Sequence, residues 1–188
     1  MLINNDTIVK DNDPLMRTKS EPVKLPLSVE DKNILMDMYN YVKDSIDPEL
    51  SEERNLRAAV GISAIQIGIP KRMTVIRLTD IDKNDNEILY EFCLVNPKII
   101  SSSLQKAYLQ SGEGCLSVIE EHEGYVVRSA RVTVEAYDAL QDKHIRIRAR
   151  GFLAIVLQHE LDHFEGTLFY DHINKDEPFK EIENALII

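Results

Sequence analysis

Residues 151–166 read Gly-Phe-Leu-Ala-Ile-Val-Leu-Gln-His-Glu-Leu-Asp-His-Phe-Glu-Gly, and they contain the pattern HExxH at positions 159–163. On an α-helix, positions i and i+4 share one face, so His159 and His163 can offer imidazole nitrogens to one metal ion. Glu160 follows the first of them directly, where a carboxylate can handle a proton of a water that the ion activates. The apolar run before the pattern predicts a helix, with Gly166 as the residue that ends it.

The alternative is an amphipathic core helix that happens to carry two histidines on one face. That face is otherwise apolar, with Phe152, Ile155 and Val156 on the preceding turns. Burying two unpaired imidazoles there would be unfavourable by several kcal/mol, and a metal ion relieves this penalty. We therefore prefer the metal site.

The chain has 188 residues, of which 44% are hydrophobic, and this suits one catalytic domain over residues 1–188. We expect residues 1–27 to form an extended lead-in with a turn at Asp13-Pro14, and residues 174–188 to form a short tail. No apolar run approaches the roughly 20 residues that span a bilayer. The N-terminus lacks a basic region followed by an apolar one, so we expect a cytoplasmic protein.

The formal net charge is −10, which disfavours long-range attraction to nucleic-acid phosphates or anionic lipid. The lysines and arginines look scattered, without a basic stripe, so we expect neither a nucleic-acid motif nor a membrane partner. Two cysteines make no disulfide framework. Cys93 lies in an apolar strand-like segment and is interpreted as core packing.

The rest of the chain predicts an α+β fold. Ser28 caps an expected helix over residues 29–45, and a second short helix is expected from Pro48 to Arg54. Alternating or β-branched patterns predict strands at Met73–Leu78, Ile88–Val95, Ala107–Gln110, Tyr125–Val127, Val132–Ala136 and His144–Arg148. The order along the chain is a helix, several strands and then the HExxH helix. This order suggests antiparallel β-sheets packed around the central HExxH helix, with the first helix at the N-terminal side.

Residues 80–91 half-match a calcium-binding loop, with Glu91 at the twelfth position. The glycine required at the sixth position is Asp85, and the flanking segments are strands. We interpret this segment as a solvated hairpin loop.

A third metal ligand must come from elsewhere in the chain. Cys115 lies in the glycine-lined segment Ser111-Gly112-Glu113-Gly114-Cys115-Leu116-Ser117, and a thiolate with two imidazoles is an accepted set for a catalytic ion. The pattern HExxHxxGxxH is excluded because Phe169 occupies the third histidine position. Glu181 or Glu183, on a short final helix, stays open as another third ligand.

Three segments together resemble peptide deformylase, in order and in rough spacing. They are Gly61-Ile62-Ser63-Ala64-Ile65-Gln66, Glu113-Gly114-Cys115-Leu116-Ser117 and Gln158-His159-Glu160-Leu161-Asp162-His163. The resemblance covers nearly the whole chain, and the long insertion between the first two segments is similar to the type II, Gram-positive-like branch. The chain departs from the usual GxGxAAPQ at Ala59, Ser63 and Ile65, and it has Ile119 where a proline commonly follows the second motif.

The resemblance implies a metal-dependent hydrolase that removes the formyl group from N-formylmethionyl nascent polypeptides and releases formate. Cys115, His159 and His163 would hold one divalent ion, often Fe²⁺ in this family, although Zn²⁺, Ni²⁺ or Co²⁺ also suit these ligands. Glu160 would act as the base. The side chain of Gln66 and the backbone N–H of Leu116 would donate to the formyl oxygen.

The resemblance further implies that the Val60-Gly61 backbone pairs with the substrate peptide as an added strand. Ile155 and Val156 precede His159 by four and three residues, so both should line an apolar pocket on the metal side. An ion pair between Glu113 and Arg128 is as plausible as two solvated side chains.

Two other functions stay open from the sequence. One is a metallopeptidase with the same ligand set, and the other is a metal-stabilised binding module without turnover. Glu160 argues against the binding module, because a structural site has no use for a base. Contact with the ribosome exit, where nascent peptides emerge, is an additional expectation.

Overall fold

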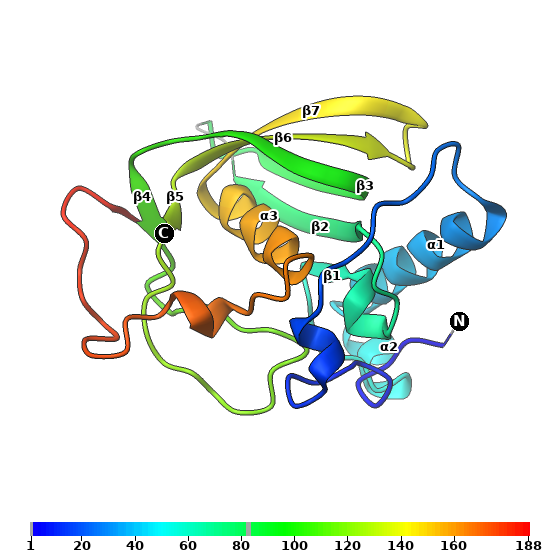
Figure 1. The fold of residues 1–188 in the computed structure, drawn as a ribbon, viewed down its shortest axis with the longest axis horizontal. Helices are drawn as coiled ribbons and strands as arrows, with labels where there is room; N and C mark the ends of the chain where they lie inside the picture. Colours follow the sequence, from blue (N-terminus) through cyan, green and yellow to red (C-terminus); the bar gives the residue numbers. More distant parts are fainter. Residues whose placement is uncertain (1, 82–83) are drawn as a thin grey trace.

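The computed structural model describes residues 2–81 and 84–188, and its frame is a five-stranded sheet in the order β1-β2-β3-β6-β7 (Figure 1). All neighbouring strands in it are antiparallel. The strands are β1 Gly61–Ser63, β2 Met73–Ile81, β3 Glu87–Ser102, β6 Arg131–Asp138 and β7 Lys143–Arg150. The predicted α+β class is confirmed, and the four predicted strands of this sheet are all found, three of them extended by three residues and β3 at 16 residues, twice the length of the predicted Ile88–Val95.

The two faces of the sheet carry different helices. Successive side chains of a strand point to opposite faces, so Val75 packs into the core beside α1 (Val29–Asp44) while Ile76 packs into the core beside α3 (Gly151–His163). The HExxH helix therefore lies against one face of the sheet, near its middle (Figure 1). This confirms the predicted central position of that helix.

The helices begin where the sequence predicted. The Ser28 hydroxyl accepts a hydrogen bond from the Asp31 N–H at 3.0 Å, which satisfies one free donor of the first turn of α1. The second helix, α2, spans Pro48–Glu53, and Asp47 caps it through the N–H groups of Glu49 and Leu50. Both predicted helices are confirmed to within one residue at their ends.

The end of α3 differs from the prediction. The helix ends at His163 with Phe164 as its C-cap, so Gly166 does not close it directly. Gly166 instead makes the next turn with φ +70°, and a Cβ there would lie 2.5 Å from the carbonyl oxygen of Arg17. The glycine is needed because the lead-in crosses the chain at this point.

A smaller sheet joins β5 (Arg128–Ser129), β4 (Lys106–Tyr108) and β8 (Leu186–Ile187), in that order. Only part of the expected Ala107–Gln110 strand is present. The predicted strand Tyr125–Val127 is wrong, because this segment is a loop and pairing starts at Arg128. The Tyr125 ring stacks on Tyr108 with centroids 4.3 Å apart, so its β-favouring side chain packs without joining a ladder.

The tail forms a strand and not a helix. Its β8 runs parallel to β4, and the Ile188 N–H donates to the Tyr108 carbonyl at 3.0 Å. Glu181 and Glu183 are exposed in the turn before it. The prediction of a final helix that brings one of these carboxylates to the metal is therefore wrong.

The lead-in is extended, with a short 3-10 segment at Pro14–Arg17 that Asp13 caps. Before it, the Val9 N–H donates to the Gln66 carbonyl at 2.8 Å and the Asp11 N–H donates to the Ser117 carbonyl at 2.7 Å. Residues 9–11 thus join the first and second sequence motifs.

The segment over residues 80–91 belongs to the hairpin that joins β2 to β3. Its strand pairing runs to Ile81 opposite Glu87, which matches the hairpin interpretation. Residues 82 and 83 of this loop lie outside the described part of the chain.

Candidate metal centre

Cys115, His159 and His163 come together at one point beside α3. The two histidines stand one helical turn apart, and Cys115 reaches them from the loop that follows β4. Their ligand atoms all lie within 4.8 Å of one another, and Cys115 Sγ is 3.5 Å from His163 Nε2. The structure therefore brings together the three residues that the sequence proposed as ligands.

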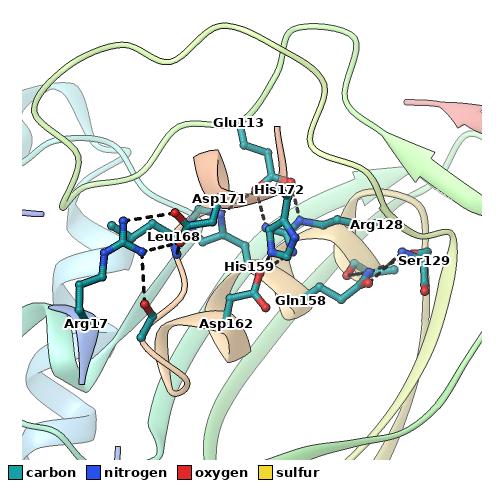
Figure 2. A network of polar contacts seen from close by, with 12 residues as sticks. Arg17, Glu113, Arg128, Ser129, Gln158, His159, Asp162, Leu168, Asp171 and His172 are labelled. Atoms are coloured by element: carbon teal, nitrogen blue, oxygen red, sulfur yellow. Dashed lines mark hydrogen bonds and ion pairs between the residues drawn. The ribbon is translucent and has the colours of Figure 1, made fainter. Parts of the chain in front are cut away.

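A buried ion pair orients His159. Nδ1 of His159 lies 2.8 Å from Glu113 Oε2, and Arg128 donates to both oxygens of Glu113 at 2.5 and 2.9 Å (Figure 2). With Nδ1 used as a donor, Nε2 stays available as an acceptor for a metal ion. The Glu113–Arg128 pair, which the sequence left open, is confirmed.

The charges in this network support one another. Burial by itself would raise the pKa of the Glu113 carboxyl, but hydrogen bonds from His159 and Arg128 lower it, so the group is ionised. Arg128 also donates to Asp162 Oδ2 at 2.8 Å (Figure 2). The guanidinium thus holds carboxylates from the second motif and from α3 together.

The cysteine has the chemistry of a metal ligand. Burial opposes ionisation of Cys115, yet His163 and His159 lower the pKa of its thiol to about 6. Cys93 is the opposite case, because burial raises the pKa of its thiol to about 12. A thiol that ionises below neutral pH, grouped with two imidazoles, fits a divalent ion such as iron or zinc.

Glu160 is buried and its carboxylate is held from the first motif. Oε2 accepts a hydrogen bond from the Ser63 hydroxyl at 2.7 Å, and the Thr74 hydroxyl lies 3.4 Å away. On the other side Oε1 faces Gly61, where an added Cβ would come within 2.6 Å of it. The carboxylate therefore has a fixed position on the residue that follows His159, one of the three candidate ligands.

Gln66 and Leu116 flank Cys115. The Ser63 N–H donates to Gln66 Oε1 at 2.8 Å, which turns the amide nitrogen toward Cys115 Sγ at 3.5 Å. The backbone N–H of Leu116 forms no hydrogen bond with any residue that the structure describes. Gln66 Nε2 also donates to the Ser117 hydroxyl at 3.2 Å, so of these two N–H donors beside Cys115 only that of Leu116 has no partner among the described residues.

A cleft of about 340 Å³ opens beside this cluster. Val60, Gly61, Ile155 and Val156 all line it, together with His159 and Glu160. All four residues proposed for substrate binding therefore border the same space. Since β1 is the edge strand of the large sheet, the backbone beside Gly61 lies at an open edge.

Sequence reasoning missed three residues that hold the site. Ser63 and Thr74 bind Glu160, and Arg57 Nη1 donates to the carbonyl oxygen of Cys115 at 3.2 Å. The presence of Ser63 where the resembling family has alanine was a usable signal for the first. Thr74 looks like any strand residue, and its role depends on the pairing of β1 with β2.

The family model described as polypeptide deformylase matches residues 5–179. The chain belongs to this family. Peptide deformylase 2 of Bacillus subtilis (strain 168) is 49% identical over 100% of this chain and 99% of the relative. Peptide deformylase of Oceanobacillus iheyensis is 46% identical over 98% of both chains. These relatives agree with the Gram-positive-like branch that the sequence motifs indicated.

Solved structures show the same similarity. Peptide deformylase from Ehrlichia chaffeensis in complex with actinonin has a TM-score of 0.69 at 29% identity, covering 95% of this chain and 92% of that one. A Met-Ala-Ser-bound class I type b peptide deformylase from Acinetobacter baumannii also has a TM-score of 0.69, at 28% identity, covering 92% and 100%.

The enzyme is therefore a metal-dependent hydrolase that removes the N-terminal formyl group from N-formylmethionyl nascent polypeptides and releases formate. This sets aside the metallopeptidase and the binding module that the sequence left open. Within the described residues, no helix is long and apolar enough to cross a membrane.

Proposed function

We propose that residues 1–188 form one catalytic domain in which Cys115, His159 and His163 hold a single divalent ion. The observation that carries this proposal is the meeting of these three ligand atoms within 4.8 Å, next to a buried carboxylate, Glu160. When bound, the ion supplies Lewis acidity, which acidifies a water and polarises the formyl carbonyl. We propose Fe²⁺ as the ion in the cell, with Zn²⁺, Ni²⁺ or Co²⁺ as substitutes.

Glu160 moves the proton in this proposal. Its carboxylate takes a proton from the attacking water and passes it to the nitrogen of the departing amine. The hydrogen bond from Ser63 fixes one oxygen of the carboxylate and leaves the other facing the cleft beside Gly61.

Gln66 and Leu116 stabilise the charge that develops on the formyl oxygen. The amide nitrogen of Gln66 and the backbone N–H of Leu116 both donate to that oxygen as it becomes negative. Removing one donor of this kind typically lowers the rate by about 10²–10³. The donors are held by the Ser63 N–H on the Gln66 side and by Arg57, through the Cys115 carbonyl, on the Leu116 side.

The substrate lies along the edge of β1. Its backbone pairs with Val60 and Gly61, and its methionine side chain packs against Ile155 and Val156 in the apolar part of the cleft. We further propose a cytoplasmic location and an encounter with nascent chains at the ribosome exit, because formylated N-termini first become accessible there.

The decisive experiment is Glu160→Gln, which keeps the shape of the side chain and removes the base. We expect kcat for formate release from a formyl-Met peptide to fall by about 10²–10⁴, while the metal content stays that of the parent. The matched control is Glu165→Gln, which removes an exposed carboxylate that pairs with Arg72 and Lys19 on the surface. A fully active Glu160→Gln enzyme would contradict the assigned base.

The metal is tested separately. Enzyme prepared anaerobically with iron should release formate at least as fast as enzyme loaded with zinc, nickel or cobalt. Slower turnover by the iron form would overturn the proposed native metal without affecting the role of Glu160.

A further inference from the structure

Strand β7 places a row of arginines on one face of the large sheet. Arg146, Arg148 and Arg150 are exposed, whereas the alternate residues Ile147 and Ala149 point into the core beside α3. Strand pairing adds the exposed Arg131 of β6, which lies opposite Arg150. It also adds the exposed Lys98 of β3, which lies opposite Glu135 of β6, the residue that faces Arg146. We name this surface the basic face, and it consists of Lys98, Arg131, Arg146, Arg148 and Arg150. The expectation that basic residues are scattered without a stripe is therefore wrong.

The charge on the basic face is largely uncompensated. Arg146 pairs with Glu135, but Arg131, Arg148 and Arg150 form no ion pair with any residue that the structure describes. Arg131 and Arg150 are directly opposite each other in the antiparallel ladder. Like charges in that arrangement destabilise a sheet, so the free protein carries a repulsion that a bound anion would relieve.

The basic face is also open and separate from the catalytic cleft. On this side of the sheet α1 packs against β2, and β7 forms the far edge, at the top of Figure 1. The cleft lies with α3, against the opposite face of the sheet. A macromolecule on the basic face would leave the route to the metal free.

We propose that the basic face binds the phosphate backbone of RNA. Guanidinium groups match phosphate oxygens through paired hydrogen bonds, and three of them recur at every second residue along one strand, about 7 Å apart. The net charge of the chain is −10, so the rest of its surface repels a polyanion. The basic face would therefore also set the orientation of the enzyme on the RNA.

Two observations favour RNA over a membrane surface. The side chains between the arginines of β7 are buried, so the row offers no large apolar group to insert among lipid chains. The enzyme acts on nascent polypeptides, which emerge from an RNA-rich particle, and in this respect the proposal rests on the function given above.

The test measures fluorescence anisotropy of a fluorescein-labelled RNA hairpin titrated with the metal-loaded, full-length enzyme. The test variant is Arg131→Gln/Arg148→Gln/Arg150→Gln. The matched control, Lys24→Gln/Lys32→Gln/Lys43→Gln, removes the same charge from exposed positions in the lead-in and α1.

We expect the parent enzyme to bind RNA more tightly at about 50 mM than at about 200 mM salt. The arginine variant should reduce the slope of log K against log salt by about 2 to 3 and weaken binding at low salt by at least about tenfold. The lysine variant should keep most of the affinity. Both should release formate from a free formyl-Met peptide at the parental rate, so loss of RNA binding and loss of deformylation are distinguishable.

Several results would overturn the proposal. They are absence of salt-dependent RNA binding by the parent enzyme, an equal loss in the lysine variant, equal binding of duplex DNA, and binding of anionic vesicles in place of RNA. Arg148→Gln alone, opposite Thr133, is the second variant if the triple variant folds poorly, and it should lower the salt slope by about 1.

Discussion

Glu160 can act as a base only if its carboxylate keeps one position, and residues of the first motif provide that position. The Ser63 hydroxyl binds Oε2 at 2.7 Å, and Gly61 lies against Oε1. The contact with Gly61 is too close for any side chain. At the scale of the residue, the site therefore depends on the hydroxyl of Ser63 and on the absence of a side chain at Gly61.

Gly61→Ala tests this dependence. The new Cβ would meet Glu160 Oε1 at 2.6 Å and Cδ at 2.9 Å, so the carboxylate must move. Misplacement of a catalytic group by about 1 Å lowers kcat by about 10²-fold. We expect a loss of this size in steady-state formate release, with unchanged metal content and little change in KM, since alanine keeps the backbone groups that pair with substrate.

The control for this prediction is the double variant Gly61→Ala/Glu160→Gln. If Gly61 acts through Glu160, the double variant should be no slower than Glu160→Gln alone. Fully additive losses would show that the glycine serves some other purpose.

The sequence predicted the reactive atoms better than the groups that hold them. His159, Glu160 and His163 follow from one helical spacing, and Cys115 follows from its glycine-lined segment. Thr74 has no comparable local signal, because it reaches Glu160 only through the register of β1 on β2. Contacts between distant segments are set by packing, which a local pattern does not encode.

At the scale of the element, the N-terminus of α1 is fixed by a buried acidic group. Asp31 accepts from Lys71 Nζ at 2.6 Å and from the Ser28 hydroxyl at 2.8 Å. Burial would raise the pKa of this carboxyl, but these two partners lower it below its ordinary value of 3.8. The ionised form is therefore favoured by folding.

This gives a prediction with a defined pH dependence. Because the pKa is lower in the folded chain, the stabilisation is present above about pH 4 and is lost as pH falls through the folded-state value. Asp31→Asn should reduce the free energy of unfolding by about 1 kcal/mol at pH 7, a modest value because Lys71 is partly exposed.

Urea unfolding at pH 7 and at about pH 3 measures this effect, and the difference between parent and variant should be smaller at the lower pH. Glu30→Gln is the matched control, since it removes an exposed acid from the same helical turn. A difference of the same size at both pH values would point to packing and not to charge.

Elements with a strong local pattern were predictable, and those made by edge pairing were not. The helices over 29–44 and 151–163 and the long strands carry the right periodicity. The tail reads as a weak helix because Glu181, Glu183 and Ala185 favour helices. It becomes a strand because β4 offers an open edge, and that edge exists only in the folded molecule.

At the scale of the whole molecule, the metal should stabilise the fold as well as the chemistry. Its proposed ligands come from the loop after β4 and from α3, so only the folded chain unites them. An ion at about 100 times its Kd adds about 2.7 kcal/mol to the stability. For a chain of this size, we expect chelation to lower Tm by about 5–10 °C.

Differential scanning calorimetry with and without chelator checks this, and adding back Fe²⁺ or Zn²⁺ should restore the parental Tm. Cys115→Ser should show a smaller shift on chelation, because it has lost a ligand. An unchanged Tm in the chelated parent would contradict a bound ion that bridges these elements.

The net charge of the chain did not indicate where its basic residues gather on the surface. A sum of −10 correctly indicates an acidic molecule, yet it conceals the basic face, because charge position depends on strand alternation and register. The residues at 146, 148 and 150 already alternate in the sequence, so the row on β7 was predictable. The opposition of Arg131 and Arg150 was not, since it requires the pairing of two strands.

The contacts of the lead-in also determine when during its own synthesis the enzyme becomes competent. Residues 9–11 leave the ribosome long before the second motif, but the Lys10 side chain donates to the Leu116 carbonyl, 106 residues later in the chain. His163 follows later still. Since such distant contacts form late and slowly, the partly made chain cannot assemble its site. This enzyme, which processes nascent chains, is thus inactive for most of the time in which it is itself a nascent chain.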